Sequence, residues 1–114
     1  MADNIFARII AKQVPAKIVY EDERVLAFRD VNPQAPIHIL VVPKQGIERI
    51  SEAGTEDEPL VGHLLTVAAQ VARQEGVDGT GYRLVINKGP DAGESVPHLH
   101  VHLLGGRPMN WPPG

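Results

Sequence analysis

Three of the five histidines in this 114-residue chain stand at alternate positions, in the segment HLHVHLL at 98–104. Such alternation is typical of a β-strand with one face on a core, because successive side chains of a strand point to opposite faces. We therefore expect a strand over 98–104, with the three imidazoles in a row on one face. Leu99, Val101 and Leu103 would then point to the other face, toward the core.

Composition limits what kind of protein carries this strand. The formal net charge of -3 gives no broad attraction to nucleic acid or to an anionic membrane, so neither is expected as a partner. No cysteine is present, which excludes disulfides, thiolate zinc sites and cysteine nucleophiles. The opening MADNIFARII lacks the charge pattern of a signal peptide, so we expect a cytoplasmic protein with a single domain over 1–114.

The rest of the chain predicts an α+β fold with five strands and two helices. A short helix starts at Asp3 or Asn4 and ends before Pro15, and a long helix begins within 56–59 and stops at Gly76. The predicted strands are 18–20 and 25–28 as a hairpin, an apolar central strand over 38–42, 82–87 and 98–104. We expect an antiparallel sheet with the long helix on one face, followed by a tail over 105–114.

Three explanations compete for the histidine row. The first is a solvated polar face, for which commoner residues such as threonine or lysine would serve equally well. The second is a zinc site, but three ligands in line on one strand do not converge on a tetrahedral ion without help from a neighbour such as His38. The third is catalysis, because neutral imidazole is a good nucleophile near pH 7 and phosphorus is a suitable electrophile.

Polar and glycine residues around the row fit a phosphorylated ligand. Gly93 permits close backbone approach, and its amide, with those of Glu94 and Ser95, could cradle phosphate oxygens. The Ser95 hydroxyl could bond the phosphate or a leaving group. Asp30 follows a predicted strand and could accept two ribose hydroxyl protons, although a turn aspartate explains it equally well on local sequence.

Several motifs together resemble the histidine-triad (HIT) superfamily, and within it the histidine-triad nucleotide-binding (Hint) branch. The segment at 98–104 fits His-φ-His-φ-His-φ-φ, where φ is apolar. The similarity runs over practically the whole chain and includes AFRD at 27–30, NPQAP at 32–36 with His38, GYR at 81–83, GGR at 105–107 and the terminal WPPG. It implies a HIT-like fold whose homodimer forms a ten-stranded sheet.

The resemblance also implies an activity. It implies a purine nucleoside phosphoramidase that hydrolyses the P–N bond of AMP–amine or GMP–amine conjugates, and slowly acyl-adenylates, without a metal or other cofactor. His100 would be the nucleophile that becomes the nucleotidyl-histidine. His102 would contact the phosphate, His98 and His38 would support the cluster, and Ser95 or a neighbouring histidine would protonate the leaving amine.

The remaining nucleotide contacts are likewise implied by the resemblance. They are Asp30 and Val31 at the ribose, Asn87 at the ribose or phosphate, Gly93, Glu94 and Ser95 at the phosphate, Phe6, Ile9, Phe28 and Leu40 at the base, and Trp111 in a tail that lies near the partner's site. Three positions depart from the family pattern and bear on substrate preference: Glu94 replaces a common glutamine, Pro97 a common aromatic residue, and Asn110 a histidine of some relatives.

Two other functions remain open at this point. One is a dinucleoside polyphosphate hydrolase, against which the GGR and WPPG motifs argue. The other is a nucleotide-binding scaffold protein with vestigial activity, against which the intact triad argues.

Overall fold

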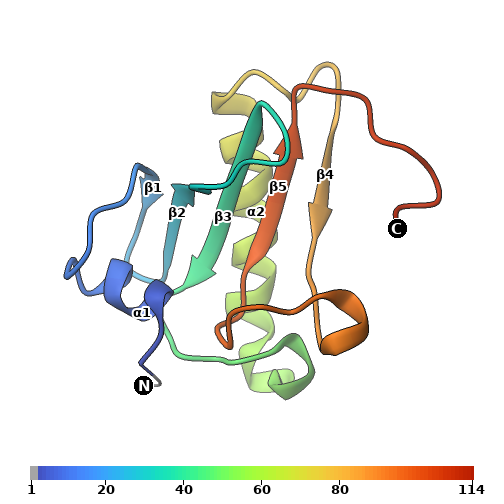
Figure 1. Ribbon diagram of the computed structural model, residues 1–114. Helices are drawn as coiled ribbons and strands as arrows, with labels where there is room; N and C mark the ends of the chain where they lie inside the picture. Colours follow the sequence, from blue (N-terminus) through green and yellow to red (C-terminus); the bar gives the residue numbers. More distant parts are fainter. Residues whose placement is uncertain (1–2) are drawn as a thin grey trace.

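The chain folds into a five-stranded sheet with a helix on each face (Figure 1). The structure is a computed structural model that describes residues 3–114. The strands are β1 (Ile18–Glu21), β2 (Val25–Arg29), β3 (Ile37–Pro43), β4 (Tyr82–Val85) and β5 (Val101–Gly105). The helices are α1 (Ile5–Ile10) and α2 (Glu58–Gln74), with short 3-10 turns at Ile50–Glu52, Thr55–Asp57 and Pro90–Ala92. Neighbouring strands are all antiparallel, in the order β1-β2-β3-β5-β4. The predicted α+β class and antiparallel sheet are confirmed.

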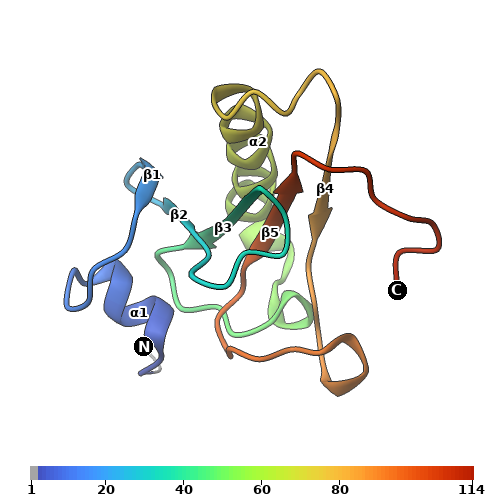
Figure 2. The same cartoon turned by 45° about the horizontal axis from the view of Figure 1, so that its top comes forward.

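The long helix α2 covers one face of the sheet (Figure 2). Its residues Leu60, Leu64, Val67 and Val71 recur at helical spacing and are all buried. They pack against the inward-facing apolar residues of the strands, which are Val25, Ala27, Ile39, Val41, Val101 and Leu103. Gly76, which has φ +76°, follows the last turn as predicted, because glycine adopts this left-handed conformation without a steric penalty.

The short helix α1 lies on the opposite face and forms a second, smaller apolar cluster. The Asn4 side chain caps it by accepting a hydrogen bond from the Ala7 N–H at 2.8 Å. Phe6 and Ile9 then pack on the outward residues of the central strands, which are Leu26, Phe28, Leu40 and Val42. The sheet face that carries α1 is therefore the face on which His38, Leu40 and His102 stand.

Two predicted strands are shorter than expected. The strand predicted over 98–104 begins only at Val101 and includes Gly105, and the strand over 82–87 ends at Val85. Before Val101 the chain leaves the ladder: the His98 N–H donates to the Val96 carbonyl, and the Leu99 N–H donates to the Ile47 carbonyl. The backbone N–H groups of these residues therefore donate hydrogen bonds to loop carbonyls and not to a neighbouring strand.

The alternation itself survives this loss of regular structure. Leu99 packs with Val101 and Leu103 in the core beneath α2, while the three histidine rings form a row on the other side. The prediction that the row lies opposite the leucines is confirmed, although regular β-structure does not hold its first two members. Among residues 3–114, no helix is both long enough and apolar enough to cross a membrane.

Candidate functional site

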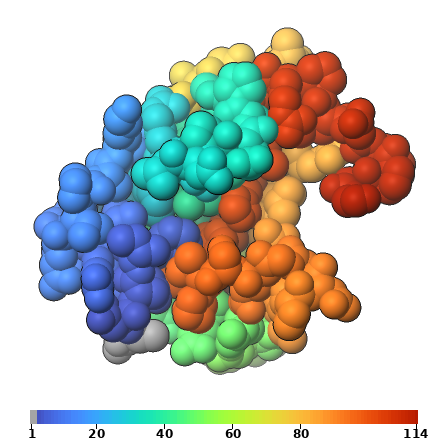
Figure 3. Space-filling model, in the orientation of Figure 1, coloured from blue at the N-terminus to red at the C-terminus, as the bar shows by residue number. Residues whose placement is uncertain are grey.

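A cleft opens on the α1 side of the sheet, beside the histidine row. Its volume is about 360 Å³, and its lining combines apolar side chains with two imidazoles, a carboxylate and a hydroxyl. In Figure 3 the surrounding segments are the blue N-terminal helix, the cyan loop after β2 and the orange loop before the triad. The lining residues are Ile5, Phe6, Ile9, Val14, Pro15, Ala16, Phe28, Arg29, Asp30, Val31, Leu40, Ser95, Val96, His100 and His102.

His100 lies at the centre of the row with its ring orientation fixed from two sides. Its Nδ1 lies 2.7 Å from the His98 carbonyl oxygen, which only accepts, so Nδ1 carries the hydrogen and donates it. The edge of Phe6 meets the ring, with centroids 5.1 Å apart. Since Nδ1 is protonated, the lone pair of neutral His100 is on Nε2. His100 therefore has the tautomer that a nucleophile attacking through Nε2 requires.

His98 is a buried support and has no access to the cleft. Its Nε2–H donates to the Pro43 carbonyl at 2.9 Å, and its Nδ1 accepts from the Asn4 amide nitrogen at 3.4 Å. Burial lowers the pKa of His98, with a further lowering from nearby His100 and an opposing effect of the bond to Pro43. A neutral imidazole with hydrogen bonds at both ring nitrogens fixes the backbone at His98, and the carbonyl of this residue orients His100.

A relay of hydrogen bonds sets the tautomer of His102. The Gln34 backbone N–H donates to His38 Nδ1 at 3.0 Å, so the hydrogen of neutral His38 is on Nε2. That Nε2–H donates to His102 Nδ1 at 2.9 Å, which leaves the hydrogen of His102 on its own Nε2. Burial, together with nearby His100 and His38, lowers the pKa of His102 to about 4. His102 is thus a neutral N–H donor at neutral pH.

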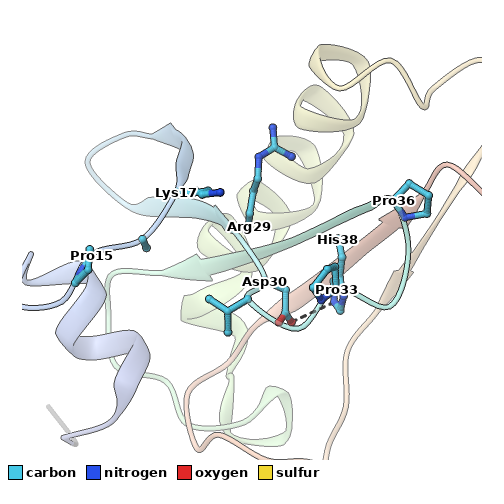
Figure 4. A pocket seen from close by; sticks show the side chains of 9 residues that line it. Pro15, Lys17, Arg29, Asp30, Pro33, Pro36 and His38 are labelled. Carbon is cyan, nitrogen blue, oxygen red and sulfur yellow. Dashed lines mark ion pairs between the residues drawn. The ribbon is translucent and has the colours of Figure 1, made fainter.

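Asp30 follows β2 directly and lies beside His38 and His102. Its Oδ1 accepts from the Asn32 N–H at 2.9 Å, as in the turn predicted for it, and Oδ2 lies 3.4 Å from His38 Nε2 (Figure 4). A second hollow of about 620 Å³ adjoins the cleft here, bounded by Lys17, Arg29 and three prolines. The carboxylate therefore lies where the two hollows meet and is only partly buried.

Asp30, His38 and His102 are also the one group of three metal-ligating side chains in residues 3–114, with one ligand atom of each within 4.8 Å of the others. The hydrogen-bond directions oppose a metal there. His38 Nε2 needs its hydrogen because Nδ1 accepts from Gln34, and His102 Nδ1 already accepts that hydrogen. An ion would have to break both bonds before it could bind two imidazoles. The donor set does not fit a resident metal.

The structure brings most of the predicted site residues to one place. His100, His102, Ser95, Asp30 and Val31 line the cleft, and so do the four residues predicted for the base, Phe6, Ile9, Phe28 and Leu40. His98 and His38 lie directly behind them. Val31 is 99% exposed and stands at the rim.

Four predicted contacts do not line this cleft: Asn87, Gly93, Glu94 and Trp111. The Glu94 side chain instead accepts hydrogen bonds from Arg49, in another segment, and from the Gly89 amide of its own loop. Trp111 is 81% exposed, in a tail that extends away from the body (Figure 1). Arg83, through Asn110 O, and Arg107, through Gln34 O, hold this tail.

Four groups that orient the histidines carry no sequence signal of that role. Three are backbone groups, the Gln34 N–H and the carbonyls of Pro43 and His98, and no side-chain pattern marks them. The fourth is the Asn4 amide, which was predicted only as a helix cap. Its second role depends on a contact between residues 94 positions apart in sequence.

Comparison with known proteins shows which family and which structures this chain is similar to. The family model described as HIT domain matches residues 11–109. A 14 kDa zinc-binding protein of Zea mays is 57% identical over 113 residues, covering 97% of this chain and 88% of that protein. A HIT family hydrolase from Legionella pneumophila has 45% identity and a TM-score of 0.96, covering 98% of this chain and 100% of the other. A histidine triad nucleotide-binding protein from Candida albicans has 25% identity and a TM-score of 0.81, covering 95% and 82%.

Proposed function

Because the chain belongs to the HIT domain family, we propose that it is a purine nucleoside phosphoramidase of the Hint type. It hydrolyses the P–N bond of AMP or GMP joined to an amine, and slowly acyl-adenylates, and it releases the nucleoside monophosphate. The structural similarity to a HIT family hydrolase supports hydrolysis in general, and the similarity to a nucleotide-binding relative supports a nucleotide ligand. The fixed tautomer of His100 is the observation that carries the more specific proposal.

The lining of the cleft offers groups that suit each of the three parts of a nucleotide. The apolar wall formed by Phe6, Ile9, Phe28 and Leu40 takes the planar purine, for which aromatic and aliphatic contacts suffice. The carboxylate of Asp30 accepts the ribose hydroxyl protons. The phosphate then lies at the imidazole end, where the His102 Nε2–H and the Ser95 hydroxyl are donors.

In the first half-reaction the Nε2 lone pair of His100 attacks the α-phosphorus in line with the amine. A nitrogen–phosphorus bond to His100 forms, the bond to the amine breaks, and the amine takes that electron pair and a proton from the Ser95 hydroxyl, which regains a proton from solvent water. The imidazole becomes positively charged, and the His98 carbonyl at Nδ1 stabilises that charge. Donors held in place before the reaction each contribute about 3 kcal/mol to lowering such a barrier.

In the second half-reaction water attacks the phosphorus of the nucleotidyl-histidine. The P–Nε2 bond breaks, the electron pair returns to His100, and the water loses a proton to the surrounding bases. The monophosphate leaves and the starting tautomer is restored. His102 stays neutral throughout at neutral pH, because burial holds its pKa at about 4.

Substitution of His100 tests this proposal directly. His100→Ala abolishes turnover of an AMP–lysine conjugate but leaves AMP binding measurable by calorimetry, and rapid quenching traps a nucleotidyl-protein in the wild type only. His63→Gln is the matched control, because His63 lies on α2, away from the cleft lining, and contacts Asp22. Turnover by His100→Ala at a near-normal rate would refute the proposal.

Two alternatives are decided by the choice of substrate. Faster cleavage of diadenosine polyphosphates than of AMP–lysine would assign the protein to the other hydrolase class. Binding of AMP without turnover of any conjugate would favour a scaffold role. A cytoplasmic location remains a prediction.

The proposal includes a homodimer with a ten-stranded sheet, which requires that two edge strands pair. Strand β4 is an edge of the sheet, and Ile86 beside it is exposed. In such a dimer the exposed Trp111 of each tail reaches the partner's cleft on the leaving-group side. Light scattering tests the dimer by measuring the mass of the protein in solution. Trp111→Ala is expected to change which amine conjugates are hydrolysed fastest, while AMP affinity stays within about twofold.

A further inference from the structure

An acidic residue, Glu94, comes one position before Ser95, the residue that the proposed function puts at the phosphate, and its side chain is held by partners away from the cleft lining. The Glu94 side chain is only 12% exposed. Its Oε1 accepts from Arg49 Nε at 3.0 Å and from the Gly89 N–H at 3.3 Å, and the Glu94 N–H donates to the Gly89 carbonyl at 3.1 Å. Glu94 thus closes the segment 89–94 into a ring that leads directly to Ser95.

The segment over 43–49 holds this region at three points. The Pro43 carbonyl accepts from His98, the Ile47 carbonyl accepts from the Leu99 N–H at 2.7 Å, and Arg49 pairs with Glu94. The first two bonds fix the histidine row through backbone atoms. The third fixes the loop that carries Ser95, and it does so through an ion pair that a substitution can remove.

The Arg49–Glu94 ion pair also changes the charge that the loop presents to a bound anion. An uncompensated carboxylate at Glu94 would repel a phosphate bound at Ser95, and such repulsion is strong where protein replaces water. Arg49 compensates it, although Glu48 and Glu52, with carboxylate oxygens 3.3 and 3.4 Å from Arg49 Nη1, compete for the same cation. The loop therefore presents a neutral pair to an anion rather than an acid.

We propose that Arg49 is a positioning residue for the anionic part of the substrate: it holds the 89–95 loop closed and neutralises Glu94 beside the phosphate. This inference rests on the proposed function, because it requires a phosphate at Ser95, His100 and His102. It assigns to Arg49, which lies outside the cleft lining, a role in selecting a nucleotide over its nucleoside.

A double-mutant cycle read with AMP and adenosine as ligands tests the proposal. Arg49→Gln weakens AMP binding about three- to tenfold, the range of a partly buried ion pair, and leaves adenosine binding unchanged. Glu94→Gln keeps an acceptor for Arg49 but removes the negative charge, so it tightens AMP binding about twofold. The double variant returns AMP affinity to within about threefold of the wild type, since neither position 49 nor position 94 then carries a charge.

The matched control is Arg8→Gln, because Arg8 Nε lies 3.0 Å from Asp3 Oδ1 in an exposed pair that does not line the cleft. It should change neither affinity. An equal loss for AMP and adenosine in Arg49→Gln, an Arg49→Gln effect no larger than that of Arg8→Gln, or no recovery in the double variant would overturn the inference.

Further measurements separate the possible failures. If Arg49→Gln does not fold, Arg49→Lys retains the charge and must retain the AMP preference, and a loss of that preference in a folded Arg49→Lys also overturns the inference. Absence of conjugate hydrolysis by the wild type refutes the proposed function, whereas the AMP-to-adenosine ratio still decides the role of Arg49.

Discussion

The contact between Asn4 and His98 predicts that one substitution, Asn4→Asp, reverses the pH dependence of the contribution of His98 to stability. Asn4 Oδ1 caps α1, and its Nδ2 donates to His98 Nδ1 at 3.4 Å. Asn4→Asp keeps the cap, since aspartate and asparagine cap helices about equally well. It replaces the donor with a carboxylate oxygen, which makes a favourable contact with His98 only when Nδ1 is protonated.

The expected size follows from the geometry. A carboxylate and an imidazolium 3.4 Å apart attract by about 5 kcal/mol at an effective dielectric constant of 20. Desolvation of buried His98 offsets most of this attraction, so we expect a net stabilisation of the protonated form by about 1–2 kcal/mol. This is large enough to raise the pKa of His98 above that of the unfolded chain.

The sign of the pH dependence then differs between variants. In the wild type, burial lowers the pKa of His98, so its contribution to stability is lost as pH falls below 6.5 toward the lowered value. In Asn4→Asp the folded pKa is raised, so the contribution is present below 6.5 and is lost as pH rises through the raised value. Relative to a neutral cap, Asn4→Asp must therefore be more stable at about pH 5.5 than at about pH 8.5.

Asn4→Ser supplies the neutral cap, because serine also caps helices and carries no charge. The assay is urea unfolding of both variants at about pH 5.5 and about pH 8.5, with imidazole NMR to follow His98. The difference in unfolding free energy between the Asn4→Asp and Asn4→Ser variants should change by about 1–2 kcal/mol between the two pH values. If the difference is the same at both, the Asn4–His98 hydrogen bond does not exist as described.

The remaining predictions concern stability and metal dependence. Gly105→Ala destabilises by about 1–3 kcal/mol in thermal unfolding, because the new Cβ would lie 2.9 Å from Val77 Cβ, whereas Gly79→Ala, with open space around it, is neutral or slightly stabilising. Burial opposes ionisation of Asp22, but hydrogen bonds from Tyr20, His63 and two backbone amides outweigh it and lower the pKa of Asp22. The wild type therefore loses stability as pH falls below about 4, and Asp22→Asn, less stable at about pH 7, shows a smaller further loss at about pH 3 in urea unfolding. EDTA leaves phosphoramidate hydrolysis unchanged, and inhibition that zinc reverses would contradict the hydrogen-bond argument against a metal.

Much of this protein is determined by local patterns in the sequence. Alternation predicts that the imidazoles oppose Leu99, Val101 and Leu103, and helical spacing predicts the buried face of α2. Both follow from the geometry of a single element, so neither needs knowledge of a neighbour. The apolar wall of the cleft, with Phe6 and Phe28, was assigned through family resemblance, because apolar spacing by itself does not distinguish a ligand wall from a core.

Tertiary contacts decided the state of each histidine. Which ring nitrogen carries the hydrogen depends on the acceptor or donor that meets the ring, and these partners are the Gln34 N–H and the carbonyls of Pro43 and His98. Backbone groups leave no trace in residue type, and the Pro43 carbonyl is also 55 positions away from the histidine that it meets. The orientation of the Glu94 side chain likewise depends on a distant residue, because it pairs with Arg49, 45 positions earlier. The sequence by itself determined that three imidazoles stand together. Which nitrogen of each is available for chemistry depended on the folded backbone: nearby groups decided it for His100 and His38, and contacts with distant segments decided it for His98 and His102.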